Sequence, residues 1–519
     1  MKRKSIISVL VISGIIFTLL SVQGHAAKLP KDILVFASTD SITTWDPSAA
    51  YSTESSYMPN IYETLIWVSP PGSKKPFQPG LAKKWKVDKK GLEWTFYLRK
   101  GVMFHDGGKL TAQAVKDSIE RTMKMKKGAA FIFSPVKEIK VIDDYTVKFV
   151  LKNAAPFDRI IASANAAWII SPNAVHKDRK WFDAGHEAGS GPYVLESWKP
   201  DEEIIFKKFD GYWKGWKGPH FNRIVVKIVK EATVADQMLE SGVADLVTRI
   251  PIESSKLLNS KKCCERLVGP SFMNYALHLN TAKFPFNQKL VRKAVSFAIP
   301  YKEIIEVAMG GLGRQAVGAV PFGQFGHDES LFQYSHDLEK ARKYMKEAGY
   351  PKGIKGKVVF TYASENAVEK AFAPLVKEEL GKIGIQVEIR PMNWTAQWDL
   401  MKGGPEKAQD MAALLWWPTF SDPYETLYSL WHAEKKPYWN FAYYKNPEFD
   451  KTILAAYSTP DGKKAQELYS KAQKMLIDDA PSIFLVDVQR PVFKSRKLKG
   501  YVINPNYPRV PFWYSMYKE

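Results

Sequence analysis

Side chains able to perform covalent catalysis occur in this 519-residue sequence without the spacing that catalysis needs. Ser190 lies in the segment 188–192 (AGSGP), which departs from the Gly-x-Ser-x-Gly pattern that exposes a nucleophilic serine. His105 and Asp106 follow a predicted strand, where such a pair forms either an acid–base couple or a turn closed by side-chain hydrogen bonds. We expect the turn, and therefore no enzyme.

Nucleotide and metal motifs are also missing. The sequence contains no Walker loop and no His-Glu-x-x-His, and its nine histidines show no metal-ligand spacing. The segment 311–316 (GLGRQA) matches a loose dinucleotide pattern, but it follows a predicted helix instead of a strand. We interpret it as a flexible turn and expect no cofactor.

The only two cysteines, Cys263 and Cys264, are adjacent. A disulfide between neighbours is strained relative to ordinary disulfide geometry. Two free thiols, or pairing with another molecule, are the alternatives, and two thiols alone make a poor metal site. In each case we expect that disulfides do not build the fold.

The N-terminus resembles a secretory signal. A basic segment (1–4) precedes an apolar run (6–20) and small residues at 24–26, which predicts cleavage after Ala26. An uncleaved anchor is the alternative, although the run is shorter than the roughly 20 residues that a bilayer requires. No cysteine lies near the cleavage site, so we expect a periplasmic protein that is not a lipoprotein.

The composition predicts well-packed cores and a basic surface. The chain is 45% hydrophobic and long enough for two or three lobes. Its net charge of +21 falls to +18 once three positive residues leave with the signal. We interpret the scattered charge as a solvated surface; attraction to anionic membranes or to an acidic ligand is the alternative. Export argues against a nucleic-acid partner.

Alternating and continuous apolar patterns predict a mixed α/β chain. Strands are expected at 93–99, 146–151, 224–229, 357–362 and 385–389. A helix over 367–383, kinked at Pro374, connects the last two strands, which makes a strand–helix–strand unit of a parallel sheet. Three further helices are expected to begin at Asn287, Pro300 and Asp337.

Seven short segments with distinctive sequences follow one another along the chain. They are 79–85 (PGLAKKW), 94–107 (WTFYLRKGVMFHDG), 110–115 (LTAQAV), 189–193 (GSGPY), 210–213 (DGYW), 291–294 (VRKA) and 422–423 (DP). In this order they resemble the extracellular solute-binding proteins of peptide-type ABC importers, from about residue 32 to the C-terminus. Members of that family bind dipeptides, oligopeptides, glutathione, nickel chelates and some oligosaccharides.

The resemblance implies a type II periplasmic-binding-protein fold, with two hinged α/β lobes and an extra domain inserted in the first. Lobe I would comprise 27–62, 189–279 and 485–519, the inserted domain 63–188, and lobe II 280–484. The binding site would lie between the lobes, where closure excludes water.

The resemblance also places ligand-binding residues on both lobes. They are Tyr51, Thr53 and Glu54 on lobe I, and Trp394, Trp398, Trp416, Trp417, Thr419 and Asp422 on lobe II. Flat aromatic rings suit sugar faces, peptide side chains or cations, and core packing is the alternative for the tryptophans.

One departure from the family concerns the ligand's charge. Peptide receptors of this family carry an Asp three residues before the Asp-Pro, and it anchors the peptide ammonium; here that position is Thr419. Asp422 either substitutes for the missing carboxylate or holds the local turn, and we favour the turn. The solute expected from the sequence is an oligosaccharide or an amine-blocked peptide, then an ordinary peptide, and last a metal chelate.

The predicted function is therefore capture without chemistry. The chain would act as a monomer, close around a small-molecule solute, and deliver it to an inner-membrane permease with its ATPase. The alternatives are a periplasmic hydrolase of peptides or glycosides, and a receptor that reports to a chemosensor.

Overall fold

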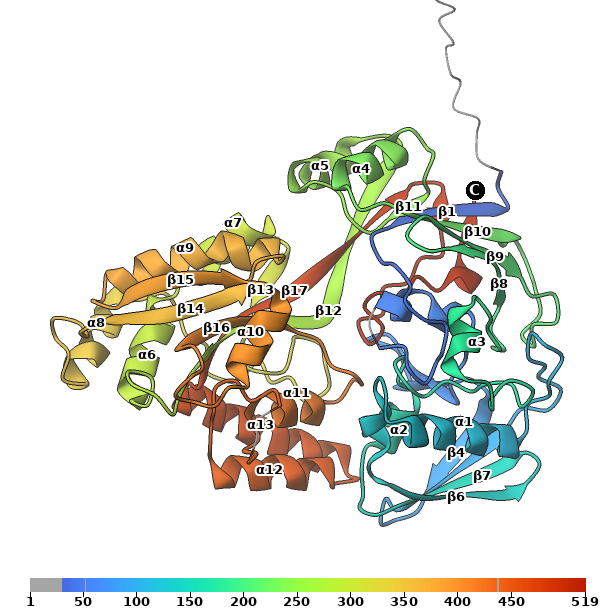
Figure 1. Cartoon of the computed structure of the whole chain (residues 1–519), viewed down its shortest axis with the longest axis horizontal. Coiled ribbons are helices and arrows are strands. Elements are labelled where there is room, and N and C mark those ends of the chain that lie inside the picture. The colour runs from blue at the N-terminus through green and yellow to red at the C-terminus, as the bar shows by residue number, and fades with distance from the viewer. Residues whose placement is uncertain (1–29, 52, 436–437) are drawn as a thin grey trace, which may run out of the picture.

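The computed structural model describes residues 30–51, 53–435 and 438–519. The predicted signal peptide (1–26) lies outside these residues. The described chain forms two α/β lobes joined by long strands, and this confirms the predicted fold class (Figure 1).

One mixed sheet of eleven strands runs through both lobes, in the order β15-β14-β16-β12-β17-β11-β1-β10-β9-β8, with β13 added beside β17. Its strands are β1 (Ile33–Ser38), β8 (Tyr193–Lys199), β9 (Glu203–Lys208), β10 (Arg223–Ile228), β11 (Leu246–Val247), β12 (Cys264–Leu279), β13 (Gly313–Gln315), β14 (Lys357–Ala363), β15 (Gln386–Met392), β16 (Met411–Trp416) and β17 (Ser482–Ser495). Two further short strands, β18 (Leu498–Lys499) and β19 (Tyr517–Lys518), pair with each other.

Strands β12 and β17 connect the lobes, as Figure 1 shows. One end of this antiparallel pair continues into β11 and β1 of lobe I, and the other end pairs through β12 with β16 of lobe II. The register shifts between Pro270 and Asn274, and this break separates the part of β12 in each lobe. The connecting strands are expected to bend where their ladder is interrupted, which makes this point the candidate hinge.

The helices cover these sheets. Lobe I carries α4 (Ala232–Glu240) and α5 (Ile252–Leu257). Lobe II carries α6 (Lys289–Ala298), α7 (Tyr301–Met309), α8 (Leu338–Glu347), α9 (Ala367–Gly381), α10 (Trp394–Met401), α11 (Pro423–Trp431), α12 (Pro447–Tyr457) and α13 (Gly462–Asp479). Helix α9 connects the parallel strands β14 and β15 and contains Pro374, as the sequence predicts.

Two local predictions are wrong. Helix α6 is preceded by Gln288, which makes no side-chain cap, so Asn287 is not its N-cap. The segment 311–316 is not only a turn, because Gly313–Gln315 forms β13 and pairs with β17. By contrast, Asp337 caps α8 by accepting a hydrogen bond from the backbone N–H of Lys340, as predicted. Cys263 and Cys264 form a disulfide with each other.

The region predicted as the inserted domain builds a four-stranded antiparallel sheet against α1 (Ala112–Met125). Its strands, in spatial order, are β4 (Ala82–Val87), β5 (Glu93–Leu98), β7 (Thr146–Leu151) and β6 (Val136–Asp143), and β2 (Ile66–Val68) pairs with β3 (Phe77–Pro79) nearby. Two short helices, α2 (Phe157–Ile161) and α3 (Arg179–Asp183), follow. One continuous apolar cluster extends from this region into lobe I, so the two share a core.

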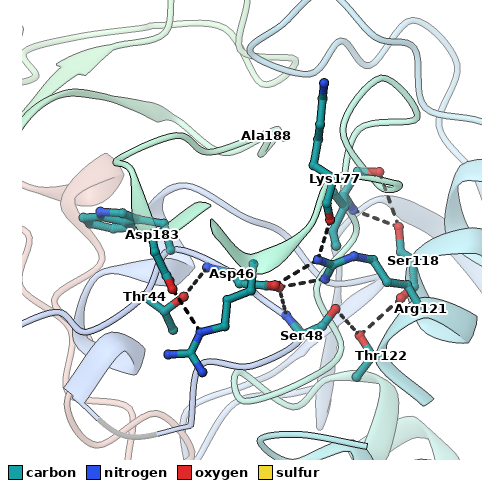
Figure 2. Close-up of polar contacts among 12 residues, drawn as sticks. Thr44, Asp46, Ser48, Ser118, Arg121, Thr122, Lys177, Asp183 and Ala188 are labelled. Atoms are coloured by element: carbon teal, nitrogen blue, oxygen red, sulfur yellow. Dashed lines mark hydrogen bonds and ion pairs between the residues drawn. The ribbon is translucent and has the colours of Figure 1, made fainter. Parts of the chain in front are cut away.

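A buried ion pair joins α1 to a loop of lobe I (Figure 2). Arg121 on α1 donates two hydrogen bonds to the carboxylate of Asp46, at 2.7 and 2.9 Å, and a third to the carbonyl of Lys177. Ser48, two residues after Asp46, bonds the hydroxyl of Thr122 at 2.8 Å. These contacts fix the loop of lobe I against α1, and hence fix the position of the residues that follow it, including Tyr51.

Candidate functional site

Hydrogen bonds join the lobes at the loop of lobe II that connects β16 to α11. The carbonyl of Thr419 accepts hydrogen bonds from Ser163 Oγ and Asn165 Nδ2, both at 2.9 Å. The hydroxyl of Thr419 lies 2.9 Å from that of Tyr51, and Arg159 donates to the carbonyl of Ser421 at 2.8 Å. Because Tyr51, Arg159, Ser163 and Asn165 precede the hinge, these bonds hold the two lobes together.

Around this junction lies a cavity of about 60 Å³ with walls from both lobes. Its lining includes Tyr51, Asn165 and Arg509 on one side and Trp417, Thr419 and Ser421 on the other. A second cavity of about 330 Å³ lies on the far side of Arg159, between the inserted region and α12–α13. The first is much smaller than the roughly 300 Å³ of an ordinary ligand pocket. A solute of several heavy atoms can therefore enter it only if the lobes move apart.

A carboxyl group that sequence reasoning missed lies directly behind Thr419. The hydroxyl of Thr419 donates a hydrogen bond of 3.2 Å to Oε1 of Glu425, on the first turn of α11. Glu425 is only 5% exposed, and its Oε2 has no hydrogen-bond partner among the described residues. Burial raises the pKa of Glu425 to about 8. The sequence feature that could have indicated Glu425 is its position as an acidic residue near a helix N-terminus, where the helix dipole favours negative charge.

Asp422 holds the local turn. Its side chain caps α11 by accepting from the backbone N–H of Tyr424 at 2.9 Å, and it also accepts from the hydroxyl of Tyr469 at 2.8 Å. Arg159 of the inserted region lies 3.4 Å from its other oxygen. Asp422 thus has a structural role, and its contact with a ligand stays a prediction.

Three of the four predicted tryptophans pack together on lobe II. The rings of Trp394 and Trp398 stack on that of Trp439, with centroids 6.3 and 5.3 Å away, and Trp416 meets Trp439 edge-on at 5.4 Å. Sequence reasoning did not single out Trp439, which is far along the chain from the other rings. Trp417 differs from them, because it is 46% exposed and lines the interlobe cavity.

Trp416 is packed against Trp439 whereas Trp417 is exposed in the cavity wall, and this difference gives a testable prediction. Trp417→Ala removes cavity wall without disturbing a core, so we expect solute affinity to fall about 10-fold with an unchanged melting temperature. Trp416→Ala removes packing against Trp439, so we expect it to lower the melting temperature as well. Isothermal titration and thermal unfolding of both variants measure this. Unchanged affinity in Trp417→Ala would contradict its place in the binding wall.

Two predicted residues of lobe I face their own loop. Thr53 donates to the carbonyl of Ser41 at 2.5 Å. The carboxylate of Glu54 accepts from the backbone N–H of Thr43 at 3.2 Å and from its hydroxyl at 2.5 Å, and the side chain is 2% exposed. They brace the loop from which Tyr51 reaches Thr419, and direct ligand contact by either of them stays a prediction.

The candidate catalytic pair is a turn, as expected. The ring of His105 lies between the carboxylate of Glu187, at 2.8 Å, and the carbonyl of Gly191, at 2.9 Å. Asp106 accepts from the backbone N–H of Gly108 and from the hydroxyl of Ser171. Within residues 30–51, 53–435 and 438–519, no three His, Cys, Asp or Glu side chains gather as a metal site. In the same residues, no helix combines the length and apolarity needed to cross a membrane.

Residues 76–438 match the family described as bacterial extracellular solute-binding proteins, family 5 Middle. The chain belongs to this family. It is 31% identical over 492 residues to the probable D,D-dipeptide-binding periplasmic protein DdpA of Escherichia coli (strain K12), covering 93% of both chains. It is 30% identical to the glutathione-binding protein GsiB of Salmonella choleraesuis (strain SC-B67), covering 94% of both.

Among solved structures, this family 5 protein resembles the periplasmic binding protein DppA of Helicobacter pylori in complex with the peptide STSA. The TM-score is 0.76 at 28% identity, over 94% of this chain and 98% of that one. The family's solute-binding activity fits a geometry in which one cavity is lined by residues of both lobes.

Proposed function

We propose that this family 5 protein captures a short peptide between its lobes in the periplasm and hands it to an inner-membrane ABC permease. The observation that carries the proposal is the junction at Thr419, where groups from both lobes converge on one residue beside a shared cavity. The relatives named for D,D-dipeptides and glutathione, and the related structure bound to STSA, support a peptide solute. A cleaved signal and a monomeric state belong to the same proposal, since one chain supplies both walls.

We propose that the amino group of the solute binds at Thr419. An oligosaccharide or amine-blocked peptide was expected because Thr419 carries no charge. Glu425 changes that expectation, since its carboxyl group lies one hydrogen bond behind Thr419. A buried cation needs a nearby carboxylate to offset desolvation, and Glu425 supplies one. A peptide with a free amino group therefore fits this site better than a neutral sugar.

The mechanism is a population shift without covalent steps. In the open form, Tyr51 and Thr419 are separated and the cavity is accessible to water. A solute that contacts both walls favours the closed form by as much as its affinity for the two forms differs. The closed form then presents one surface from both lobes to the permease, and its opening there releases the solute.

Removing the interlobe bonds should open the protein. Ser163→Ala combined with Asn165→Ala deletes both donors to the carbonyl of Thr419, at a cost of about 2 kcal/mol to the closed form. We expect a larger radius of gyration in small-angle X-ray scattering without solute, and a return to the wild-type value at saturating peptide. Asn153→Ala, an exposed asparagine of the same region, is the control. A double variant as compact as wild type would contradict the proposed latch.

Native mass spectrometry of protein purified from the periplasm tests the solute class directly. We expect a bound mass that fragments as a peptide. A thermal-shift panel of free peptides, N-acetylated peptides and oligosaccharides then ranks the candidates. Turnover of the bound peptide would instead support the hydrolase, and failure of loaded protein to stimulate ATP hydrolysis by the reconstituted permease would support a chemosensory role.

A further inference from the structure

Two arginines of lobe I line one small cavity, and one of them also lines the interlobe cavity. Arg490 is on β17, next to the hinge, and Arg509 is in the segment after β18. Arg509 lines the interlobe cavity and also a smaller one of about 20 Å³, whose wall includes Arg490 and Tyr501. This smaller space exceeds the roughly 10–15 Å³ that one water molecule needs, so a small polar group fits there.

No residue that the structure describes forms an ion pair that would neutralise the positive charge of these two arginines. Within the described ranges, the side chain of Arg490 makes one hydrogen bond, to the carbonyl of Pro508. Arg509 makes no hydrogen bond to the part of the chain that the structure describes, and its guanidinium lies 5.6 Å from the ring centre of Trp417. Neither arginine forms an ion pair with a described residue. By contrast, the half-buried Arg121 has Asp46 as its partner.

The surroundings of Arg490 favour an added anion. Burial lowers the pKa of Arg490, and the neighbouring charge of Arg509 acts in the same direction. Tyr501 and Asp40 act in the opposite direction, but Asp40 is not close enough to pair. Each guanidinium offers five N–H donors in a planar fork that matches a carboxylate, and most of these donors are unused here.

We propose that Arg490 and Arg509 form the subsite for the carboxylate of the captured solute. The proposal rests on the peptide capture argued above and assigns the opposite end of the solute from the one read by Thr419 and Glu425. Bidentate hydrogen bonds from charged guanidinium groups are strong and directional, so they also fix the orientation of the peptide. Because Arg509 contacts Trp417 across the cleft, a carboxylate held here favours the closed form.

The test compares peptides that differ only at their C-terminus. For wild type, calorimetric titration should show a peptide acid binding about 10- to 100-fold more tightly than its C-terminal amide. Arg509→Gln should remove that preference, by weakening the acid while leaving the amide within about twofold. Arg509 is the better variant, because it makes no described hydrogen bond whose loss would disturb the fold. Arg490→Lys, which keeps the charge but loses the fork, should reduce the preference in part.

Arg223→Gln, an exposed arginine of lobe I paired with Glu196, is the matched control and should behave as wild type. Equal binding of acid and amide by wild type would overturn the subsite while peptide capture stands. If no peptide binds, capture itself fails, and a second measurement still decides the subsite. Replacing chloride by acetate at constant ionic strength should raise the melting temperature of wild type but not of Arg509→Gln. An equal response of both proteins to acetate would overturn the subsite.

Discussion

Glu425→Gln should weaken the binding of peptides with a free amino group by about 10- to 100-fold at pH 8, while N-acetylated peptides bind as before. The carboxyl group is buried behind Thr419 and is the nearest acidic group to its hydroxyl. Gln keeps the shape and the hydrogen bond but not the charge, so the variant isolates the electrostatic contribution. Titration calorimetry with matched free and acetylated peptides measures it.

The affinity of the wild type for peptides with a free amino group should depend on pH, and the pKa of Glu425 gives the direction of that dependence. The pKa of Glu425 is about 8 without solute because of burial, and a bound ammonium group would lower it. Binding therefore releases a proton below pH 8, so affinity should rise from about pH 6 towards pH 8. Above about pH 8 affinity should fall again, because the α-amino group of the free peptide loses its own proton there. Tyr51, with a pKa raised to about 12 by burial, does not titrate in this window, and Asp422 is the other acidic group nearby.

Two comparisons keep this prediction falsifiable. Glu448→Gln, on the exposed face of α12, should leave both affinity and pH profile unchanged. In Glu425→Gln the rise in affinity between pH 6 and pH 8 should be absent for free peptides. If free and acetylated peptides lose affinity equally, Glu425 supports the fold of the loop and does not read the amino group.

Arg121→Ala should destabilise the protein by about 3–5 kcal/mol, because it leaves the buried carboxylate of Asp46 without its partner. The effect should appear in the first unfolding transition in urea, since the pair joins α1 to the loop of lobe I. Solute affinity should fall as well, because Tyr51 follows that loop.

The control for this prediction removes both charges. Asp46→Leu combined with Arg121→Met replaces the pair by apolar side chains of similar size, and it should recover most of the lost stability. Arg179→Ala, which breaks an exposed pair with Asp183, should change the transition little. A double variant no more stable than Arg121→Ala would show that the pair's other hydrogen bonds carry the effect and the buried charge does not; these run from Arg121 to the carbonyl of Lys177 and from the backbone N–H of Ser48 to Asp46.

Local patterns in the sequence were enough to find many of the elements. Alternating apolar residues located β5 and β7, and Asp337 marked the start of α8, because side-chain periodicity and helix capping act between residues close in the chain. The prediction that Asn287 caps α6 is wrong, because the neighbouring Gln288 takes the cap position without a side-chain bond. The segment 311–316 was misjudged because its pairing partner is in β17, beyond the reach of any local pattern.

The sequence by itself determined the family, the α/β class and the loop that carries Thr419, since ordered short motifs and local periodicity are written along the chain. Only the tertiary structure decided what surrounds that loop. Tyr51 and Thr419 are 368 residues apart, and they meet because β12 and β17 bring the lobes together. The stack on Trp439 and the two arginines that no described residue pairs depend in the same way on chain segments whose packing no spacing encodes.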